Sequence, residues 1–214
     1  AAHCVAYKPN LAFYECYGIE GLRALDATVD YIRTKYPEIF LIADAKRGDI
    51  GNTAKMYAKA FFEEMDFDAV TIAPYMGADS VTPFLEYKDK WAIVLALTSN
   101  ASAYQFQSAQ KDGKPLYQAV MEEMMEISTP DNMMFVVGAT KADKLEELRS
   151  FCPDNFFLVP GVGAQGGSAE EVIAHGSNDH GGLLINSSRG ILFADSTEDF
   201  ATVAGKVAAQ TANL

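Results

Sequence analysis

The sequence predicts an α/β protein of the (β/α)8 TIM barrel class, and two patterns indicate that fold. Short runs rich in β-branched and aromatic residues alternate with segments of helical period, which is typical of βα units on a parallel sheet. Most of these runs are almost continuously apolar, as expected for strands covered on both faces. Because 49% of the 214 residues are hydrophobic, the chain has enough apolar material for the core of one such domain.

Seven strands are expected from the apolar runs: Cys4–Lys8, Phe40–Asp44, Ala69–Ile72, Ala92–Thr98, Phe135–Gly138, Phe156–Pro160 and Leu183–Asn186. A regular barrel of this class closes with eight strands, so we expect the first strand to precede Ala1 and to be absent from the chain. Residues 1–214 are then a single barrel domain that begins at the end of the first helix. An open doubly wound sheet, which needs no eighth strand, is the alternative fold.

Amphipathic stripes indicate the helices between these strands. We expect them to pack into the core, and they comprise Ile19, Leu22, Leu25, Val29 and Ile32, then Val120, Met124 and Ile127, and finally Phe200, Val203 and Val207. No internal repeat or linker interrupts the pattern, so no domain boundary is expected.

Composition excludes several classes of protein. The formal net charge of -12 argues against a nucleic-acid-binding surface. No apolar run approaches the roughly 18 residues that a membrane span needs, and no signal-peptide pattern is present, so a cytoplasmic protein is expected. The three cysteines and three histidines do not have the spacing of metal ligands, so no metal site is expected.

Charged side chains follow the second predicted strand at the point where it ends. Four ionisable residues lie within residues 44–49, among them Asp44, Lys46 and Asp49. Active sites of parallel barrels lie at the carboxyl ends of the strands, and residues two apart on a strand share a face. Two carboxylates beside Lys46 would keep its amine protonated, so that it acts as a cationic acid. A solvated charge cluster on a loop is the alternative.

Two glycine-containing segments near the end of the chain indicate a phosphate site. Residues 160–168 form a glycine-rich loop after one strand, and Ser188, Arg189 and Gly190 follow the next strand. Loops after the last two strands of such barrels often bind phosphate through backbone N–H groups, and an arginine adds a bidentate contact. An ordinary structural turn is the alternative.

These motifs together resemble the orotidine monophosphate decarboxylase family, in particular its bacterial subgroup with longer chains. The similar segments occur in the order typical of the family and span nearly the whole chain: Y-K-P-N at 7–10, D-A-K-R-G-D-I at 44–50 with its extension through Thr53, T-S-N at 98–100, P-G-V-G-A-Q-G-G at 160–167 and S-R-G-I at 188–191. The DxKxxD pattern within them is shared with sugar-phosphate decarboxylases and hexulose-phosphate synthases.

The resemblance implies a cofactor-independent carboxy-lyase that converts orotidine 5′-monophosphate to uridine 5′-monophosphate in de novo pyrimidine biosynthesis. Lys8, Asp44, Lys46 and Asp49 would form an alternating charge network, in which Lys46 donates a proton to C6. The resemblance further implies a homodimer in which Asp49, Ile50 and Thr53 contact the partner's site.

The resemblance also implies the substrate contacts. Ser99 would contact the pyrimidine, Gln165 would contact base and phosphate, and Arg189 would contact the phosphate. Pro160, Gly166 and Ser188 would be neighbouring substrate-binding residues.

The resemblance also implies a ribose-binding aspartate on the first strand, and no matching residue is present in this sequence. The segment from Asn100 to Lys114 is expected to belong to a mobile cover over the site.

Three other functions remain open from the sequence. A metal-assisted sugar-phosphate decarboxylase or aldolase would keep the DxKxxD residues and Arg189. A Schiff-base aldolase would need Lys46 as a neutral amine, which flanking carboxylates disfavour. A non-catalytic barrel that binds a phosphate ligand would use the glycine-rich loop but would have no need of the charge cluster.

Overall fold

A computed structural model describes residues 1–162 and 167–213, without the side chains of residues 141–143. The chain divides into two compact units. The first comprises His3–Leu95 with Asp131–Met133, and the second comprises Ala96–Pro130 with Met134–Leu214. The expectation of one domain over residues 1–214 therefore stays a prediction.

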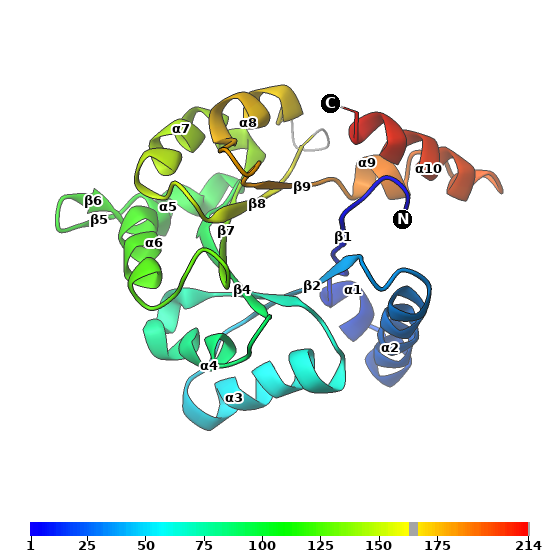
Figure 1. The fold of residues 1–214 in the computed structure, drawn as a ribbon, viewed down its shortest axis with the longest axis horizontal. Helices are drawn as coiled ribbons and strands as arrows, with labels where there is room; N and C mark the ends of the chain where they lie inside the picture. The colour runs from blue at the N-terminus through cyan, green and yellow to red at the C-terminus, as the bar shows by residue number, and fades with distance from the viewer. Residues whose placement is uncertain (163–166, 214) are drawn as a thin grey trace. The chain divides into compact units, whose positions relative to one another are not determined.

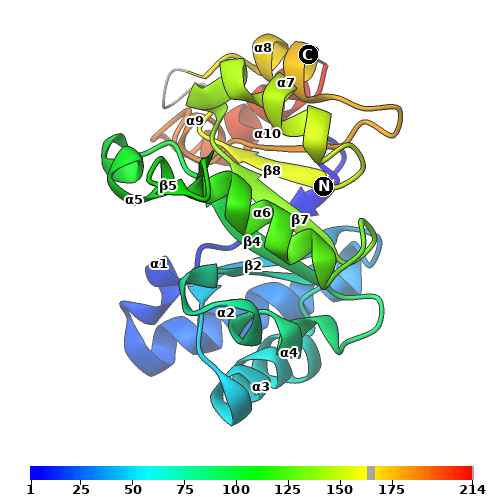
Figure 2. The ribbon, with the colours of Figure 1, turned by 90° about the vertical axis from the view of Figure 1, so that its left-hand side faces the viewer.

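The first unit alternates strands with helices (Figure 1). Its elements are β1 (Ala6–Tyr7), α1 (Ala12–Glu15), α2 (Gly18–Lys35), β2 (Phe40–Arg47), α3 (Gly51–Lys59), a π-helical turn (Ala60–Glu64), β3 (Ala69–Ile72), 3-10 turns (Pro74–Met76 and Ala78–Ser80), α4 (Thr82–Leu85) and most of β4 (Trp91–Leu97). Strands β1 to β4 pair in parallel and in chain order. Helices α2, α3 and α4 lie together on one side of β2 and β4 (Figure 2).

The second unit continues the alternation after the end of β4. Its elements are a 3-10 turn (Ala101–Ala103), α5 (Tyr104–Gln107), the hairpin strands β5 (Gln110–Lys111) and β6 (Lys114–Pro115), α6 (Leu116–Glu126), most of β7 (Met133–Val137), a 3-10 turn (Ala139–Lys141), α7 (Ala142–Phe151), β8 (Phe156–Pro160), α8 (Ala169–Gly176), β9 (Leu183–Asn186), α9 (Arg189–Leu192) and α10 (Phe200–Thr211). Strands β7, β8 and β9 pair in parallel and in chain order.

All seven predicted strands are present, although some of their bounds differ. Strand β1 is shorter than predicted, so that Lys8 follows the strand, whereas β2 extends beyond Asp44 to Arg47. The residues of β3 are all buried, as are all five residues of β7. This burial agrees with the apolar runs from which the strands were predicted, because strands covered on both faces need apolar side chains in both directions.

The predicted helical stripes are confirmed only in part. Leu25, Val29 and Ile32 of α2 are buried, but Ile19 and Leu22 are exposed, and their predicted core packing is wrong. Leu22 neighbours Gly21, where the carbonyl oxygen of Tyr14 in α1 comes so close that a Cβ would lie 1.8 Å from it. Helix α1 thus approaches the start of α2 through its backbone, and the buried stripe of α2 begins only one turn later.

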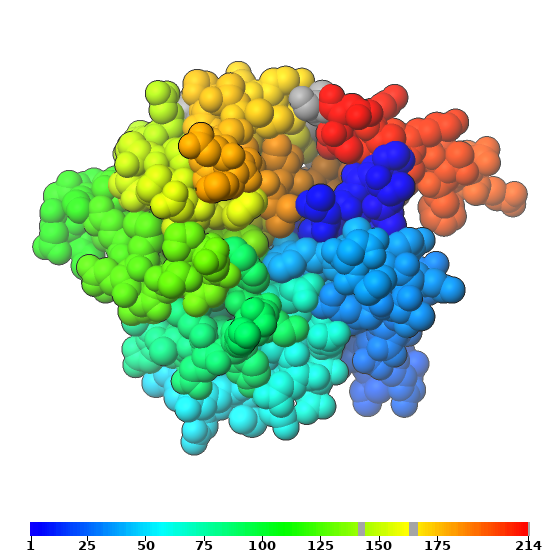
Figure 3. Space-filling view, viewed as in Figure 1, coloured from blue at the N-terminus to red at the C-terminus, as the bar shows by residue number. Residues whose placement is uncertain are grey.

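The other two stripes show the same departure. Met124 of α6 is buried, whereas Ile127 lies beyond the end of the helix and is exposed. No residue of α10 is buried: Phe200 is exposed, and Val203 and Val207 are half-buried. Figure 3 shows this last helix, in red, at the surface. The core packing predicted for Phe200 and Ile127 is therefore wrong.

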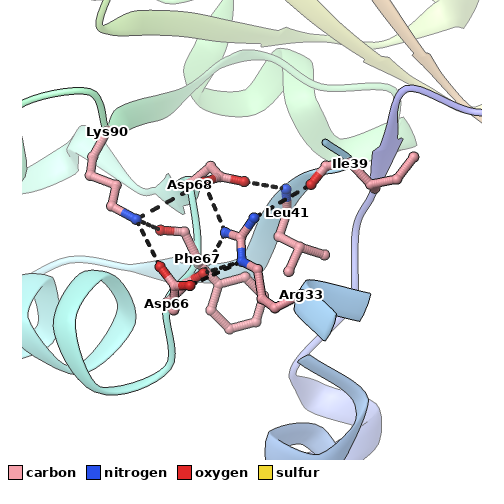
Figure 4. Close-up of polar contacts among 7 residues, drawn as sticks. All are labelled: Arg33, Ile39, Leu41, Asp66, Phe67, Asp68 and Lys90. Carbon is pink, nitrogen blue, oxygen red and sulfur yellow. Dashed lines mark hydrogen bonds and ion pairs between the residues drawn. The ribbon is translucent and has the colours of Figure 1, made fainter. Parts of the chain in front are cut away.

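A network of ion pairs ties the amino ends of β2, β3 and β4 to the end of α2 (Figure 4). The guanidinium of Arg33 contacts the carboxylates of Asp66 at 3.2 Å and Asp68 at 2.8 Å. Asp68 also accepts a hydrogen bond from the backbone N–H of Leu41 at 2.7 Å. Lys90 contacts Asp66 at 3.3 Å and donates to the carbonyl of Phe67 at 2.7 Å.

The side chains of Arg33, Asp68 and Lys90 are only 18 to 24% exposed, so water screens this network less than it screens a surface pair. Both cations donate to backbone carbonyls of neighbouring segments, and the Asp68 carboxylate accepts from the backbone N–H of Leu41. The network therefore fixes how three strands begin, at the end opposite to the one where barrel active sites lie.

We predict that Asp68→Ala lowers the free energy of unfolding by about 1–3 kcal/mol, because it removes the partner of Arg33 and leaves the Leu41 N–H without its acceptor. Urea unfolding of purified wild type and variant measures the difference. Glu20→Ala is the control, since the Glu20–Arg23 pair is more than 70% exposed on both sides and should change stability by less than about 0.5 kcal/mol. Equal effects of the two substitutions would contradict a specific role for the network.

Candidate active site

The carboxylate of Asp44 lies between two lysine ammonium groups in the first unit. Lys8 Nζ contacts Asp44 Oδ2 at 2.5 Å, and Lys46 Nζ contacts Asp44 Oδ1. The backbone places them: the N–H of Asp44 donates to the carbonyl of Pro9 at 3.0 Å, so that the segment after β1 runs beside β2. The sequence predicted these three residues as one cluster, and the structure brings them together.

Burial and charge act in opposite directions on Asp44. Its side chain is 7% exposed, and this burial on its own raises the pKa of the carboxyl. The attraction of Lys8 and the hydrogen bonds from Lys46 and Lys8 lower the pKa by more, so it lies below its ordinary value of 3.8. The carboxylate is therefore ionised at neutral pH.

The Lys46 ammonium contacts the Asp44 carboxylate, yet the Lys46 side chain remains accessible to solvent. Its side chain is 50% exposed, whereas that of Lys8 is 13% exposed. Its backbone has a φ of 47°, in the left-handed region, and the pairing of β2 with β3 shifts register between Ala43 and Arg47. Lys46 thus departs from the regular strand geometry on which the prediction of a shared face was based. Its ammonium nevertheless contacts Asp44, as that prediction requires.

Asp49 lies apart from this cluster. Its carboxylate accepts a hydrogen bond from the backbone N–H of Ile50 at 2.7 Å, and Asp49 and Lys46, both of them described, form no ion pair. The expectation that two carboxylates of the same chain flank Lys46 is therefore wrong for Asp49. Ile50 precedes α3 and is half exposed, and Thr53 is exposed in the first turn of α3.

In the second unit, Ser99 follows β4 and lies against the end of β7. The N–H of Gly138 donates to the carbonyl of Leu97 at 2.8 Å. A Cβ on Gly138 would lie 2.6 Å from the Cβ of Ser99, so a larger residue would push the serine away. Gly138 thus allows the close approach of the two segments that positions Ser99.

A side-chain clamp holds the residue before Ser99. The amide of Gln107 accepts from the N–H of Thr98 at 2.8 Å and donates to the Thr98 hydroxyl at 2.7 Å. The same hydroxyl lies 2.6 Å from Asn100 Oδ1. Because Gln107 belongs to the expected cover, that segment and the start of the Ser99 loop are connected directly. The mobility of the cover stays a prediction.

The predicted phosphate-binding residues are described only in part. Pro160 ends β8 and pairs with Asn186 of β9, and Ser188 and Arg189 are exposed at the start of α9. Gln165 and Gly166 lie outside the described residues. The hydroxyl of Ser168 accepts from the N–H of Glu171 and so caps the beginning of α8.

Thr71, a buried residue of β3, belongs to the cluster although its sequence pattern did not predict it: its hydroxyl contacts both Asp44 and the backbone of Lys46. The only signal in the sequence was one hydroxyl side chain within the apolar run 69–72.

In the part of the chain that the structure describes, no group of three or more His, Cys, Asp or Glu residues is placed to hold a metal ion. No described helix is long and apolar enough to span a membrane.

The parallel strands, with an ion-paired cluster of charged side chains at the carboxyl end of β2, define a barrel-type α/β protein. The family model described as orotidine 5′-phosphate decarboxylase / HUMPS family matches residues 1–202, and the chain belongs to this family.

Individual relatives agree with this assignment. The orotidine 5′-phosphate decarboxylase of Phocaeicola vulgatus is 56% identical over 209 residues, which cover 97% of this chain and 77% of that protein. The enzyme of the same name from Christiangramia forsetii is 56% identical over 203 residues, 95% of this chain and 75% of that protein. The structure of Leishmania donovani OMP decarboxylase has a TM-score of 0.86 and 36% identity, and the match covers 99% of this chain and 81% of that one. This likeness confirms the barrel class over the open doubly wound sheet.

We predict that Asp44 makes the wild-type protein more sensitive to acid than an Asp44→Asn variant. A carboxyl with a lowered folded-state pKa contributes stability in full above its unfolded pKa and loses it as the pH falls through the lower folded value. Below about pH 4, the free energy of unfolding should therefore fall more steeply for wild type.

Urea unfolding of the two proteins between about pH 2 and pH 6 tests this, since the ordinary pKa of aspartate lies within that range. Asp26→Asn is the control, because Asp26 is an exposed carboxylate on α2 and its loss should leave the pH dependence close to that of wild type. Parallel curves for wild type and Asp44→Asn would contradict the prediction.

Proposed function

We propose that the protein is an orotidine 5′-monophosphate decarboxylase, which releases CO2 from its substrate and forms uridine 5′-monophosphate in de novo pyrimidine biosynthesis. Membership of the family supports this reaction. The observation that carries it is the ion-paired cluster of Lys8, Asp44 and Lys46 at the carboxyl end of β2. A cytoplasmic location fits an enzyme of this pathway.

Lys46 is the proposed acid. When the bond between C6 and the carboxylate breaks, the electron pair stays on C6 and CO2 leaves. An ammonium beside C6 stabilises that developing negative charge and then donates its proton to C6, after which the lysine regains a proton from water. The half-exposed side chain of Lys46, held at Asp44 but open on its other side, suits this role. No cofactor is part of the proposal.

Asp44 and Lys8 are proposed to set the charge around Lys46. The ionised Asp44 contacts both ammonium groups at hydrogen-bond distance and so holds the Lys46 ammonium in place. Asp44 would also face the substrate carboxylate, where repulsion of like charges raises the energy of the bound substrate and is relieved when CO2 departs. Lys8, whose side chain is 13% exposed, holds the Oδ2 atom of Asp44.

Substrate binding is proposed for the residues that the family resemblance assigns. Ser99 would contact the pyrimidine, Gln165 would bridge base and phosphate, and Arg189 would bind the phosphate. Pro160, Gly166 and Ser188 would line the same loops. Phosphate binding away from C6 can supply energy that is used in the transition state, provided that closure of a cover couples the two.

A homodimer with shared active sites is the proposed assembly. Asp49, Ile50 and Thr53 would reach into the site of the partner subunit. The support in this chain is that Asp49 does not pair with Lys46 of the same chain, while Ile50 and Thr53 expose their side chains at the beginning of α3. Asp49 would then complete the charge network of the second subunit.

We predict that the purified protein consumes orotidine 5′-monophosphate in the presence of EDTA, followed as loss of substrate absorbance. Lys46→Ala should lower kcat roughly 100- to 10 000-fold, because it removes the acid, while binding of uridine 5′-monophosphate is largely kept. Lys88→Ala is the matched control, since the Lys88 side chain is 92% exposed, and it should leave kcat unchanged.

Three outcomes would contradict this function. Metal-dependent turnover of a sugar phosphate, without turnover of orotidine 5′-monophosphate, would favour the metal-assisted alternative. Unchanged turnover in Lys46→Ala would show that the cluster is not catalytic. Trapping of a substrate adduct on Lys46 by borohydride would instead indicate a Schiff-base enzyme.

The shared site can be tested with a mixed dimer of one Lys46→Ala subunit and one Asp49→Ala subunit, isolated through two different affinity tags. Each homodimer should be nearly inactive. The mixed dimer contains one site with both residues intact, so it should show about half of the wild-type activity, given two equivalent sites in a symmetric dimer. An inactive mixed dimer, or a wild-type protein that is monomeric and fully active, would contradict the shared site.

A further inference from the structure

A buried threonine lies directly beneath the charge cluster. Thr71 is in the middle of β3, is 1% exposed and is flanked along the strand by the buried residues Val70 and Ile72. A hydroxyl in such surroundings is costly unless it is hydrogen-bonded. The hydrogen-bond partners of Thr71 therefore explain why this buried position holds a polar side chain.

The Thr71 hydroxyl links the backbone of Lys46 to the side chain of Asp44, both in β2. It accepts a hydrogen bond from the backbone N–H of Lys46 at 2.9 Å. Its own proton can go to Asp44 Oδ1 at 3.2 Å or to the carbonyl of Ala43 at 3.5 Å. A hydroxyl has one proton, and the carboxylate is both nearer and charged, so Asp44 is the favoured acceptor.

The bond to the Lys46 N–H acts on a backbone that needs support. A φ of 47° is disfavoured for any residue with a Cβ, and in this chain it occurs where the register of β2 against β3 shifts. A disfavoured conformation persists only when its surroundings hold it. Thr71 supplies such a contact at the N–H of the residue concerned.

Thr71 therefore holds Lys46 from both ends. One hydrogen bond fixes the backbone of Lys46, and the other orients Asp44. The Oδ1 atom of Asp44 also accepts the hydrogen bond from the Lys46 ammonium. A small shift of either partner would move the ammonium relative to a substrate atom. Displacements of about 1 Å can reduce rates by roughly 100-fold when geometry limits the reaction.

We propose that Thr71 is a positioning residue that fixes the direction of the Lys46 ammonium through its backbone and through Asp44. The proposal rests on the proposed function, since it concerns how that reaction is aligned. Thr71 is buried, and within the described part of the chain its hydroxyl bonds to groups of β2, so its loss acts on kcat and leaves KM nearly unchanged.

The test compares Thr71→Val, which keeps the shape but loses the hydroxyl, with Thr71→Ser, which keeps the hydroxyl. Steady-state decarboxylation of orotidine 5′-monophosphate is measured for both. Thr71→Val should lower kcat roughly 10- to 100-fold with little change in KM, and Thr71→Ser should recover most of the loss. Ile72→Val is the control, because it shortens an apolar side chain of the same buried strand that makes no hydrogen bond to Asp44 or Lys46, and it should keep the wild-type kcat.

A second measurement does not depend on turnover. Hydrogen exchange of the Lys46 amide, followed by NMR, should be slow in wild type and Thr71→Ser and faster in Thr71→Val, relative to the amides of the surrounding strand. If Thr71→Val does not fold, Thr71→Ala is compared with Thr71→Ser in the same two measurements.

The outcomes separate this inference from the proposed function. A wild-type protein that does not turn over orotidine 5′-monophosphate overturns the proposed function. An active wild type with an unchanged kcat in Thr71→Val overturns the role of Thr71. Failure of Thr71→Ser to recover activity, or an equal loss of kcat in Ile72→Val, also overturns it, because each would indicate a general packing effect.

Discussion

The ionised carboxylate of Asp44 is the group on which the arrangement of the first unit's functional residues depends. It binds two ammonium groups, one from the segment after β1 and one from the end of β2, and it accepts a further hydrogen bond from β3. Three consecutive parallel strands thus meet at one side chain. Burying that carboxylate is unfavourable in isolation, and the two lysines more than offset the cost. Without it, two cations would face each other with no counterion.

The opposite ends of β2, β3 and β4 show a different use of charge. There Arg33, Lys90, Asp66 and Asp68 are paired with one another and with backbone groups. At the carboxyl end, the Lys46 side chain is held at one carboxylate but remains half exposed. The first network joins the beginnings of the strands, whereas the second includes a cation whose side chain is half exposed. This division matches the general separation of stability and activity between the two ends of parallel barrels.

Most of the fold was predictable because buried parallel strands require apolar side chains in both directions. Runs such as Ala69–Ile72 and Phe156–Pro160 therefore appear directly in the sequence. The exposure of Ile19 and Phe200 was not predictable, since periodicity indicates an apolar face but not how far the neighbouring segments cover it. Spacing alone led to the expectation that Asp49 lies beside Lys46, because distance along the chain does not reveal which way the backbone turns after β2; the family resemblance instead implied a contact of Asp49 with the partner's site.

The site was predictable to the extent that charged residues interrupt apolar runs. Lys8, Asp44 and Lys46 stood out for that reason, whereas Thr71 did not, because threonine is a common β-strand residue and its hydroxyl gives no signal in a pattern of apolar positions. The left-handed backbone of Lys46 likewise has no signature in the sequence, because such a conformation normally indicates glycine or asparagine.

That backbone conformation has a consequence for how the chain can change over evolution. Glycine at position 46 would adopt a φ of 47° without the steric cost of about 1–2 kcal/mol that a Cβ brings. Glycine would, however, also remove one of the two ammonium groups that offset the burial of the Asp44 carboxylate, so relief of the backbone strain would be opposed by loss of an ion pair. A substitution at position 46 must therefore exchange a strained backbone for an unbalanced buried charge, which narrows the set of residues that the position can accept.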